Sequence, residues 1–214
     1  MYKKYKKITF ICMNLSCGGT EKVVTNLAYY YSKKNIPTSI ITLGEADLFN
    51  SFKFSKKTEL IELKKKYSSF IFCRFLNIIY FIYKINKYMK KNNNSIYISF
   101  LTIPNILTTI ASLNLKSVNF GSERINPKYA ELSIFWRILR FIFYRRLKNL
   151  IVQTEEIKNN FKNFIFEKKI KIIPNSIDLS TVKRHHKVLK NKKLKVLFIG
   201  RIEYQKGIDI LLDA

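Results

Sequence analysis

The sequence predicts an α/β domain that is doubly wound around a mainly parallel sheet, followed by an incomplete second domain. Two observations predict this fold. Short apolar runs of strand length alternate along most of the chain with segments of helical periodicity. The first run, residues 8–15 (ITFICMNL), is almost continuously apolar, as in a strand that is buried on both faces of a sheet.

The remaining elements follow in order. Residues 16–19 (SCGG) end the first strand, and residues 20–34 carry apolar side chains at helical spacing, with Thr20 as a candidate N-cap. Further strands are predicted at residues 38–43, 58–63, 95–100, 117–121, 149–154 and 171–176. Helices are predicted between most of these strands, at residues 67–91, 103–113, 130–147 and 155–164.

The character of the chain changes near residue 178. A polar and strongly basic stretch, typical of an interdomain linker, precedes a new apolar run at residues 194–199. We therefore predict a first domain over residues 1–178, a linker over 179–193 and only the start of a second domain over 194–214. Because that last strand has no sheet of its own, we expect residues from about 183 onward to be poorly packed.

The charge of the chain limits its partners. Its 40 Lys and Arg against 14 Asp and Glu give a net charge of +26, which favours phospholipid head groups, nucleic acid or phosphorylated substrates. No RNA-binding aromatic signature, zinc pattern or helix-turn-helix signal is present, so no specific nucleic acid is expected. The three cysteines lack metal-ligand spacing and predict thiols in a reducing cytosol. No metal or cofactor is expected.

Two glycine turns could carry ligand chemistry. Gly18 and Gly19 let a ligand approach the backbone beside a helix N-terminus, although a tight turn without a ligand explains them equally well. Gly200 ends the last strand, and Arg201 and Lys206 in the loop after it could both point at one anion, such as a diphosphate. The alternative is two solvated cations.

Several segments, taken in one order, resemble the retaining glycosyltransferases of family 4. These enzymes have the GT-B architecture of two facing Rossmann-like domains. The resemblance covers essentially the whole chain and rests on residues 15–28 (LSCGGTEKVVTNLA), 99–111 (SFLTIPNILTTIA), 121–127 (GSERINP), 150–161 (LIVQTEEIKNNF), 172–178 (IIPNSID) and 200–214 (GRIEYQKGIDILLDA).

The resemblance implies transfer of a hexose or N-acetylhexosamine from a nucleotide sugar, with UDP as the expected nucleotide. The implied acceptor is a lipid-linked glycan or an envelope polysaccharide such as lipopolysaccharide or capsule. Gly18 and Gly19 would lie beside the donor diphosphate and the acceptor. Arg201 and Lys206 would neutralise the leaving nucleoside diphosphate.

The resemblance also implies an acceptor-side cleft that contains Ser122, Glu123, Arg124 and Asn175. Glu123 is the candidate catalytic residue, because its carboxylate could bind or orient an acceptor hydroxyl. The alternative for Glu123 is a structural salt bridge to Arg124 or another neighbour. Asn175 could simply form the turn after Pro174.

The sequence departs from the family pattern in two respects. The family's E-x7-E motif in the second domain is absent from these residues, and so is most of the nucleotide pocket. Many relatives place a histidine near the reacting sugar, whereas His185 and His186 fall in the predicted linker. We therefore expect little or no transferase activity from residues 1–214 alone. An inactive truncated product and a basic polyanion-binding or nucleic-acid-binding module are the alternatives.

Two basic aromatic helices predict contact with an anionic membrane surface. Residues 70–91 and 133–149 mix large apolar side chains with cations that could reach lipid phosphates. The expected membrane-facing residues are Trp136, Arg137, Arg140 and Arg145. Packing of one helix face on the sheet is the alternative. This interpretation predicts a cytoplasmic protein that is peripheral on the inner face of the membrane.

Overall fold

A computed structural model gives the structure of the chain. It describes residues 7–16, 18–46, 57–67, 71–176, 196–200, 202 and 207–213. The chain divides into two units, Met1–Asn175 and Ser176–Ala214, and each is described by itself.

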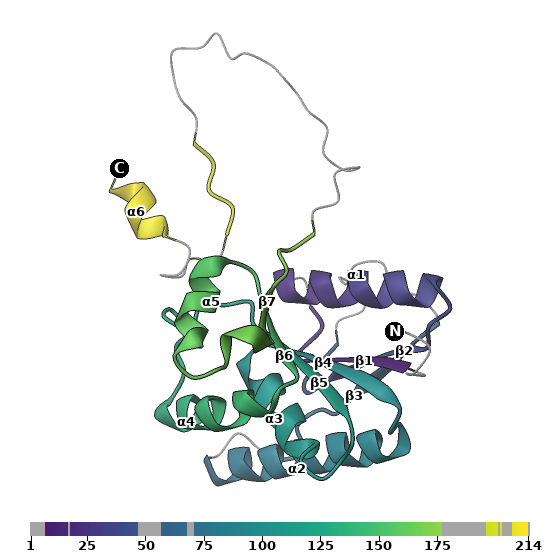
Figure 1. Cartoon of the computed structure of the whole chain (residues 1–214). Helices are drawn as coiled ribbons and strands as arrows, with labels where there is room; N and C mark the ends of the chain where they lie inside the picture. Colours follow the sequence, from purple (N-terminus) through teal and green to yellow (C-terminus); the bar gives the residue numbers. More distant parts are fainter. Residues whose placement is uncertain are drawn as a thin grey trace. The chain divides into compact units, whose positions relative to one another are not determined.

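The first unit is built on a seven-stranded sheet in which every neighbouring pair is parallel (Figure 1). Its order is β3-β2-β1-β4-β5-β6-β7. The strands are β1 (Lys7–Cys12), β2 (Thr38–Thr42), β3 (Thr58–Glu62), β4 (Ser95–Phe100), β5 (Val118–Ser122), β6 (Asn149–Val152) and β7 (Ile170–Ile172). The strand order reverses between β1 and β4, and open α/β sheets bind ligands outside the carboxyl ends of their strands at such a reversal.

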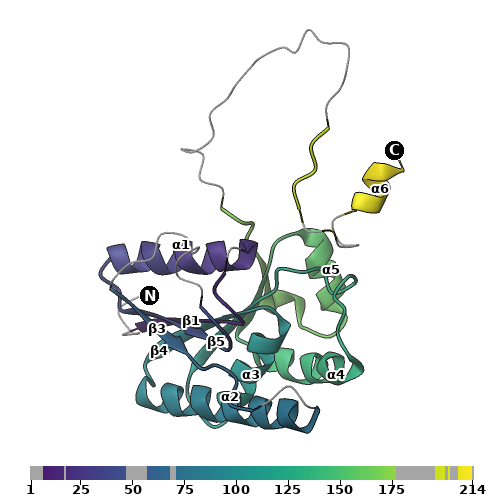
Figure 2. The same cartoon turned by 180° about the vertical axis from the view of Figure 1, so that it is seen from behind.

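Helices cover both faces of the sheet, as Figures 1 and 2 show from opposite sides. Helix α1 packs on one face, and α3 lies between α2 and α4 on the other. The helices are α1 (Gly19–Lys33), α2 (Ile71–Lys91), α3 (Thr102–Ala111), α4 (Ile134–Phe143) and α5 (Glu155–Lys162), with short 3-10 turns η2 (Tyr144–Arg146) and η3 (Glu167–Lys169). The predicted doubly wound α/β fold is confirmed.

Two predicted helix features differ in detail. The helix predicted at residues 130–147 is shorter: α4 ends at Phe143, and the 3-10 turn η2 completes the segment. Helix α1 starts at Gly19 with Gly18 as its N-cap and has no side-chain cap, so Thr20 lies inside the helix.

The core lies on both sides of β1, which explains the continuous apolar run in its sequence. Phe10 packs with Val24 of α1 on one face, whereas Ile11 packs with Ile85 of α2 on the other. All four side chains are fully buried. Neighbouring side chains of a strand point to opposite faces, so a strand covered on both faces needs apolar residues at consecutive positions.

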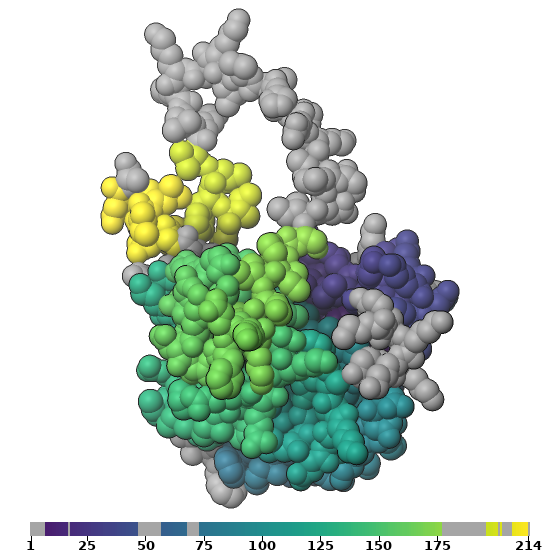
Figure 3. Space-filling model, viewed as in Figure 1, coloured from purple at the N-terminus to yellow at the C-terminus, as the bar shows by residue number. Residues whose placement is uncertain are grey.

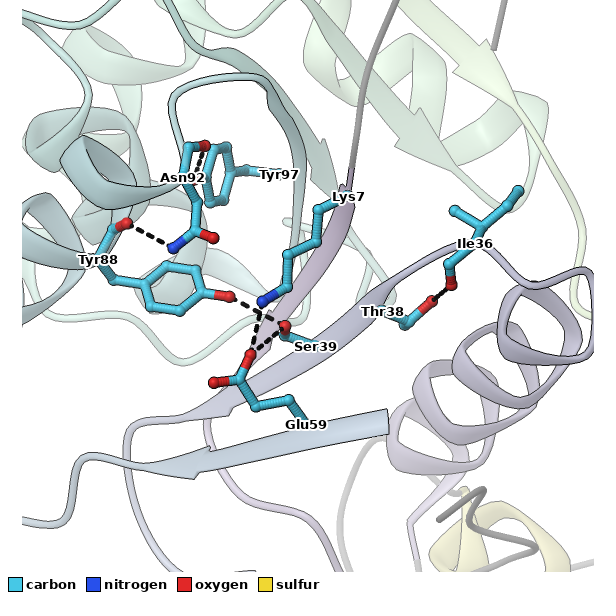
Figure 4. A network of polar contacts seen from close by, with 8 residues as sticks. All are labelled: Lys7, Ile36, Thr38, Ser39, Glu59, Tyr88, Asn92 and Tyr97. Carbon is cyan, nitrogen blue, oxygen red and sulfur yellow. Dashed lines mark hydrogen bonds and ion pairs between the residues drawn. The ribbon is translucent and has the colours of Figure 1, made fainter. Parts of the chain in front are cut away.

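A polar network joins edge strand β3 to the rest of the sheet near the amino ends of the strands (Figure 4). The Lys7 ammonium of β1 pairs with the Glu59 carboxylate of β3. Ser39 of β2 donates a hydrogen bond to the same carboxylate at 2.9 Å, and the Tyr88 hydroxyl of α2 donates to Ser39 at 2.9 Å. One carboxylate on the outermost strand is thereby linked to two inner strands and to α2.

Among its described residues the second unit has one short helix, α6 (Ile208–Leu212), which follows Gly207, whose φ of 62° is left-handed. The strand predicted at residues 194–199 is not formed over its described part, residues 196–199. Val196, Leu197 and Ile199 are 65–87% exposed, and none of the described strands pairs with them. The predicted domain boundaries at 178 and 193 stay predictions, since residues 177–195 lie outside the described residues.

Candidate functional site at the carboxyl edge of the sheet

The residues that the sequence singled out in the first unit follow the carboxyl ends of different strands. Gly18 and Gly19 come after β1, Ser122 ends β5 with Glu123 and Arg124 next to it, and Asn175 follows β7. Because parallel strands end at one edge, the topology brings these segments to the same side of the sheet. Arg201 and Lys206 lie outside the described residues.

Glu123 lies beneath this edge in a buried polar network. Its side chain is 2% exposed, and its carboxylate accepts hydrogen bonds from Thr102 at 2.7 Å and from the Tyr144 hydroxyl. Its backbone N–H donates to the Ile151 carbonyl of β6 at 2.8 Å. The alternative of a salt bridge from Glu123 to Arg124 is not what the structure shows, because hydroxyl groups supply the partners.

Burial controls the ionisation of this network. Removal of water raises the pKa of Glu123, although the hydrogen bonds from Tyr144 and Thr102 and the positive charge of Arg140 partly oppose the rise. Burial, together with the neighbouring Glu123 carboxylate, raises the pKa of Tyr144 well above its usual value. Tyr144 therefore stays protonated and acts as the hydrogen-bond donor of the pair.

The network continues into α3 through residues that the sequence analysis missed. The Asn105 amide donates to the Tyr144 hydroxyl at 3.0 Å and accepts from Ser99 of β4 at 2.7 Å. Asn105 and Ser99 are fully buried. One signal could have found them: both are polar residues inside the apolar stretch SFLTIPNIL, and buried polar groups require partners.

Arg124 is the cation of the described site. Its guanidinium donates a hydrogen bond through Nη1 to the side-chain carbonyl of Asn175. The same guanidinium lies 5.5 Å from the ring centroid of Phe100, the last residue of β4. Its Nε is buried and has no hydrogen-bond partner among the described residues. Arg124 and Asn175 thus lie in contact, whereas the side chains of Ser122 and Glu123 lie below the surface, 1% and 2% exposed.

The glycine turn after β1 leaves open space beside the backbone. A Cβ added at Gly19 meets no atom within 4 Å, and Gly19 has no left-handed φ, so neither packing nor conformation requires glycine there. The Glu21 side chain lies over Gly18: its Oε2 is 2.2 Å from the position that a Cβ would take if one were added to Gly18. The carboxylate of Glu21 therefore already places negative charge at the N-terminus of α1.

The backbone is strained where β4 ends. Leu101 has φ 72° and ψ 164°, a region that is essentially restricted to glycine. Two hydrogen bonds hold it there: its N–H donates to the Ser122 carbonyl at 2.9 Å, and its carbonyl accepts from the Asn105 N–H at 3.0 Å. The strained residue lies directly beside the strand-order reversal.

The predicted membrane-facing residues of α4 and η2 divide into two groups. Arg137 and Arg145 are exposed, and Trp136 is partly buried against the core. Arg140 differs from the prediction: it is only 9% exposed, and its guanidinium lies 5.7 Å and 5.9 Å from the ring centroids of Phe161 and Phe164. The register of α4 turns Arg140 toward α5, where these rings and the Glu123 charge accept a cation.

Many apolar side chains of α4 lie on its outer face instead, although Trp136, Leu139 and Phe143 pack against the core. Five of them are between 43% and 67% exposed: Ile134, Phe135, Ile138, Phe141 and Ile142. This set, which we call the α4 apolar face, recurs at the spacing of one helix side. In Figure 3, α4 lies at the lower left of the first unit.

Two further properties concern the described residues as a whole. None of their helices is long and apolar enough to cross a bilayer. Their His, Cys, Asp and Glu side chains form no group of three that could hold a metal ion.

A model of the family described as Glycosyltransferase Family 4 matches residues 17–181. A curated relative from Campylobacter jejuni is 27% identical over 208 residues, covering 97% of this chain and 56% of the relative. It is named GalNAc-alpha-(1->4)-GalNAc-alpha-(1->3)-diNAcBac-PP-undecaprenol alpha-1,4-N-acetyl-D-galactosaminyltransferase. The chain therefore spans little more than half the length of this relative.

Three solved structures share the fold of the chain. The lipopolysaccharide outer core galactosyltransferase WaaB superimposes with a TM-score of 0.63 at 16% identity, covering 82% of this chain and 47% of WaaB. Anabaena HepE in complex with UDP and glucose superimposes with a TM-score of 0.62 at 12% identity, and the match covers 82% of this chain and 46% of HepE. Sucrose-phosphate synthase from Thermosynechococcus elongatus superimposes with a TM-score of 0.65 at 13% identity, and the match covers 82% of this chain and 49% of the synthase.

Proposed function

Because the chain belongs to glycosyltransferase family 4, we propose that it forms the acceptor side of an enzyme that transfers a hexose or N-acetylhexosamine from a nucleotide sugar. The proposed acceptor is a glycan linked through diphosphate to a polyprenyl lipid. The name of the Campylobacter relative, which specifies a sugar transferred to such a glycan, supports this acceptor class. The UDP and glucose bound to HepE support a UDP-linked donor.

Arg124 is the observation that carries the proposal. A partly buried guanidinium that is fixed by Asn175 and by the Phe100 ring holds a positive charge at the carboxyl edge, where it can pair with an anionic oxygen. Both proposed substrates carry diphosphate groups. When the bond between the anomeric carbon and the diphosphate breaks, negative charge grows on the leaving oxygen, and a fixed cation stabilises it.

The other predicted residues have supporting roles in this proposal. The open space at Gly19 admits the substrate close to the backbone, and Arg201 and Lys206 neutralise the leaving diphosphate from the second domain. Glu123 acts as a positioning residue rather than by contact with the acceptor, because it is buried. It fixes the end of β5, from which Arg124 follows, through Thr102, Tyr144 and the backbone of β6.

The test is transfer of a radiolabelled sugar from UDP to lipid-linked acceptor glycans by the protein purified from its source cells. Arg124→Gln is expected to lower kcat/KM roughly 10–100-fold, because it removes a charge-assisted contact of ~1.5–3 kcal/mol. Arg146→Gln removes an exposed arginine outside this site and serves as the matched control. Unchanged transfer by the Arg124 variant would contradict the proposal, as would the absence of transfer from every nucleotide sugar.

The α4 apolar face supports a peripheral position on an anionic membrane. Its isoleucines and phenylalanines can enter the interface while the exposed Arg137 and Arg145 reach lipid phosphates. Co-sedimentation with vesicles that contain 30% anionic lipid tests this. Ile138→Ser combined with Ile142→Ser is expected to release the chain at low salt. Binding that these changes leave intact would show that charge alone attracts the protein.

A further inference from the structure

We propose that an open cavity lined in part by α2, α3 and α4 binds the first isoprene units of the polyprenyl chain of the acceptor, with the acceptor diphosphate at its rim. This inference rests on the proposed function and names the site for the lipid part of its substrate. The cavity has a volume of about 300 Å³, which is at the lower end of the ~300–1,000 Å³ of ligand pockets.

The interior of the cavity is apolar. Its floor is formed by Met13 and Leu43, which directly follow β1 and β2 at the carboxyl edge of the sheet. Its walls come from Phe81 of α2, Leu107 of α3 and Trp136 of α4. Such walls do not satisfy the hydroxyl groups of a sugar, whereas they match the branched hydrocarbon of an isoprenoid.

The rim of the cavity is basic and held in place. Lys65 and Arg74 line it, and both are exposed. The segment that carries Lys65 is clamped by the buried Asn77, whose Oδ1 accepts the backbone N–H groups of Lys66 and Tyr67, each at 3.0 Å. Two cations beside an apolar cavity are complementary to an anion with an apolar tail.

The outer surface of α2 offers a continuation for a longer chain. Phe75, Ile79 and Tyr83 recur every fourth residue and are 49–59% exposed. Residues at this spacing share one helix side, so the hydrocarbon can leave the cavity along an apolar stripe instead of entering water. This combination of apolar cavity, basic rim and apolar stripe favours a polyprenyl diphosphate over a free phosphate or a neutral lipid.

Trp136 makes the cavity directly observable, because it is the single tryptophan of the chain. Farnesyl diphosphate, a short water-soluble member of the ligand class, is titrated into the 214-residue chain while tryptophan emission is recorded. We expect a saturable change in emission. Inorganic diphosphate, farnesol and dodecyl sulfate are the comparison probes, each expected to bind at least tenfold more weakly.

Paired variants separate the cavity from the surface. Ile78→Phe fills the cavity and is expected to weaken the binding of farnesyl diphosphate at least tenfold. Leu113→Phe makes a similar change at an exposed position that neither lines the cavity nor belongs to the apolar stripe of α2, and it leaves binding unchanged. Lys65→Gln is expected to weaken the binding of farnesyl diphosphate several-fold and to leave the binding of farnesol unchanged. Lys66→Gln is the control variant. Circular dichroism confirms that each variant is folded, and photo-crosslinking of the unaltered chain by a photoreactive farnesyl diphosphate is expected to label α2 and α3.

Three results would overturn the inference: equal binding of inorganic diphosphate, equal binding of dodecyl sulfate, or crosslinks confined to other elements. The transferase assay separates its failure from that of the proposed function. Transfer to a lipid-linked acceptor without farnesyl diphosphate binding sinks this inference alone. Farnesyl diphosphate binding without sugar transfer sinks the proposed function alone.

Discussion

Tyr144→Phe isolates the hydroxyl at the centre of the buried network. The Tyr144 side chain is fully buried, and its ring stacks on Phe161 with centroids 6.0 Å apart, a contact that phenylalanine keeps. The variant removes the hydrogen bond to the Glu123 carboxylate and the one from the Asn105 amide. A bond to a charged group contributes ~1.5–3 kcal/mol and a neutral one ~0.5–1.5 kcal/mol, so we expect a loss of about 2–4 kcal/mol in unfolding free energy.

The pH dependence of this loss gives a second criterion. The folded-state pKa of Glu123 is raised above its unfolded value near 4.5, so its stabilising contribution is full below that pH and decreases as pH rises toward the folded pKa. The hydrogen bond from Tyr144 opposes this rise in pKa. Without the hydroxyl the pKa of Glu123 rises further, so the destabilisation grows as pH rises through the folded-state pKa of Glu123.

Urea unfolding of the chain at several pH values measures both effects, and the thermal midpoint should fall by roughly 4–16 °C. Tyr97→Phe is the matched control. Tyr97 is equally buried, but its hydroxyl donates to the neutral Asn92 carbonyl at 2.8 Å. Its loss should be about 1 kcal/mol and independent of pH between 4 and 8. A Tyr144→Phe loss below ~0.5 kcal/mol, or one that does not change with pH, would refute the reasoning.

Three further predictions concern single positions. Lys7 holds the pKa of Glu59 below its usual value, so the stability that this ion pair contributes is lost as pH falls below about 4.5. Because the Glu59 side chain is 53% exposed, Glu59→Gln should lower the unfolding free energy by under ~1 kcal/mol in low-salt urea titrations, and by less in high salt. At Leu101, glycine should be more stable than alanine by ~1 kcal/mol or more in the same assay, the reverse of the usual order, because φ is 72°. Gly121→Ala should destabilise the fold by ~1–3 kcal/mol, since the Cβ of the new alanine would lie 2.6 Å from the Leu147 side chain. Gly19→Ala should keep full stability and lower sugar transfer, because a Cβ there meets no atom within 4 Å. Equal thermal midpoints for the two alanine variants would contradict this prediction.

Most of the fold could be predicted because buried parallel strands have a distinctive sequence. The apolar run around Phe10 and Ile11 reflects burial on both faces, and the alternation of strands and helices indicates the doubly wound sheet. The run at residues 194–199 is also largely apolar, yet it forms no strand over its described part. Composition alone does not reveal whether a strand has a neighbour to pair with.

The site was less predictable because its polar partners come from distant segments. The GSER segment located Glu123 and Arg124, but Tyr144 was read only as part of a basic aromatic helix. Its burial depends on the end of α4 at Phe143 and on the approach of Phe161 from α5, neither of which has a local signal. Arg140 was assigned to the surface for the same reason: the rings that hold it belong to another helix.

The position of β1 has a consequence for the newly synthesised chain. β1 is a central strand, yet one of its two neighbours is β4, so Lys7 can pair with Ser95 only after the ribosome has produced the intervening chain. At ~5–20 residues per second this takes roughly 5–20 s. During that time one edge of the apolar strand KITFIC has no partner, and unpaired edges recruit other chains. The strand order that places a ligand edge beside β1 therefore also leaves this segment of the nascent protein without its second neighbour until β4 has been made.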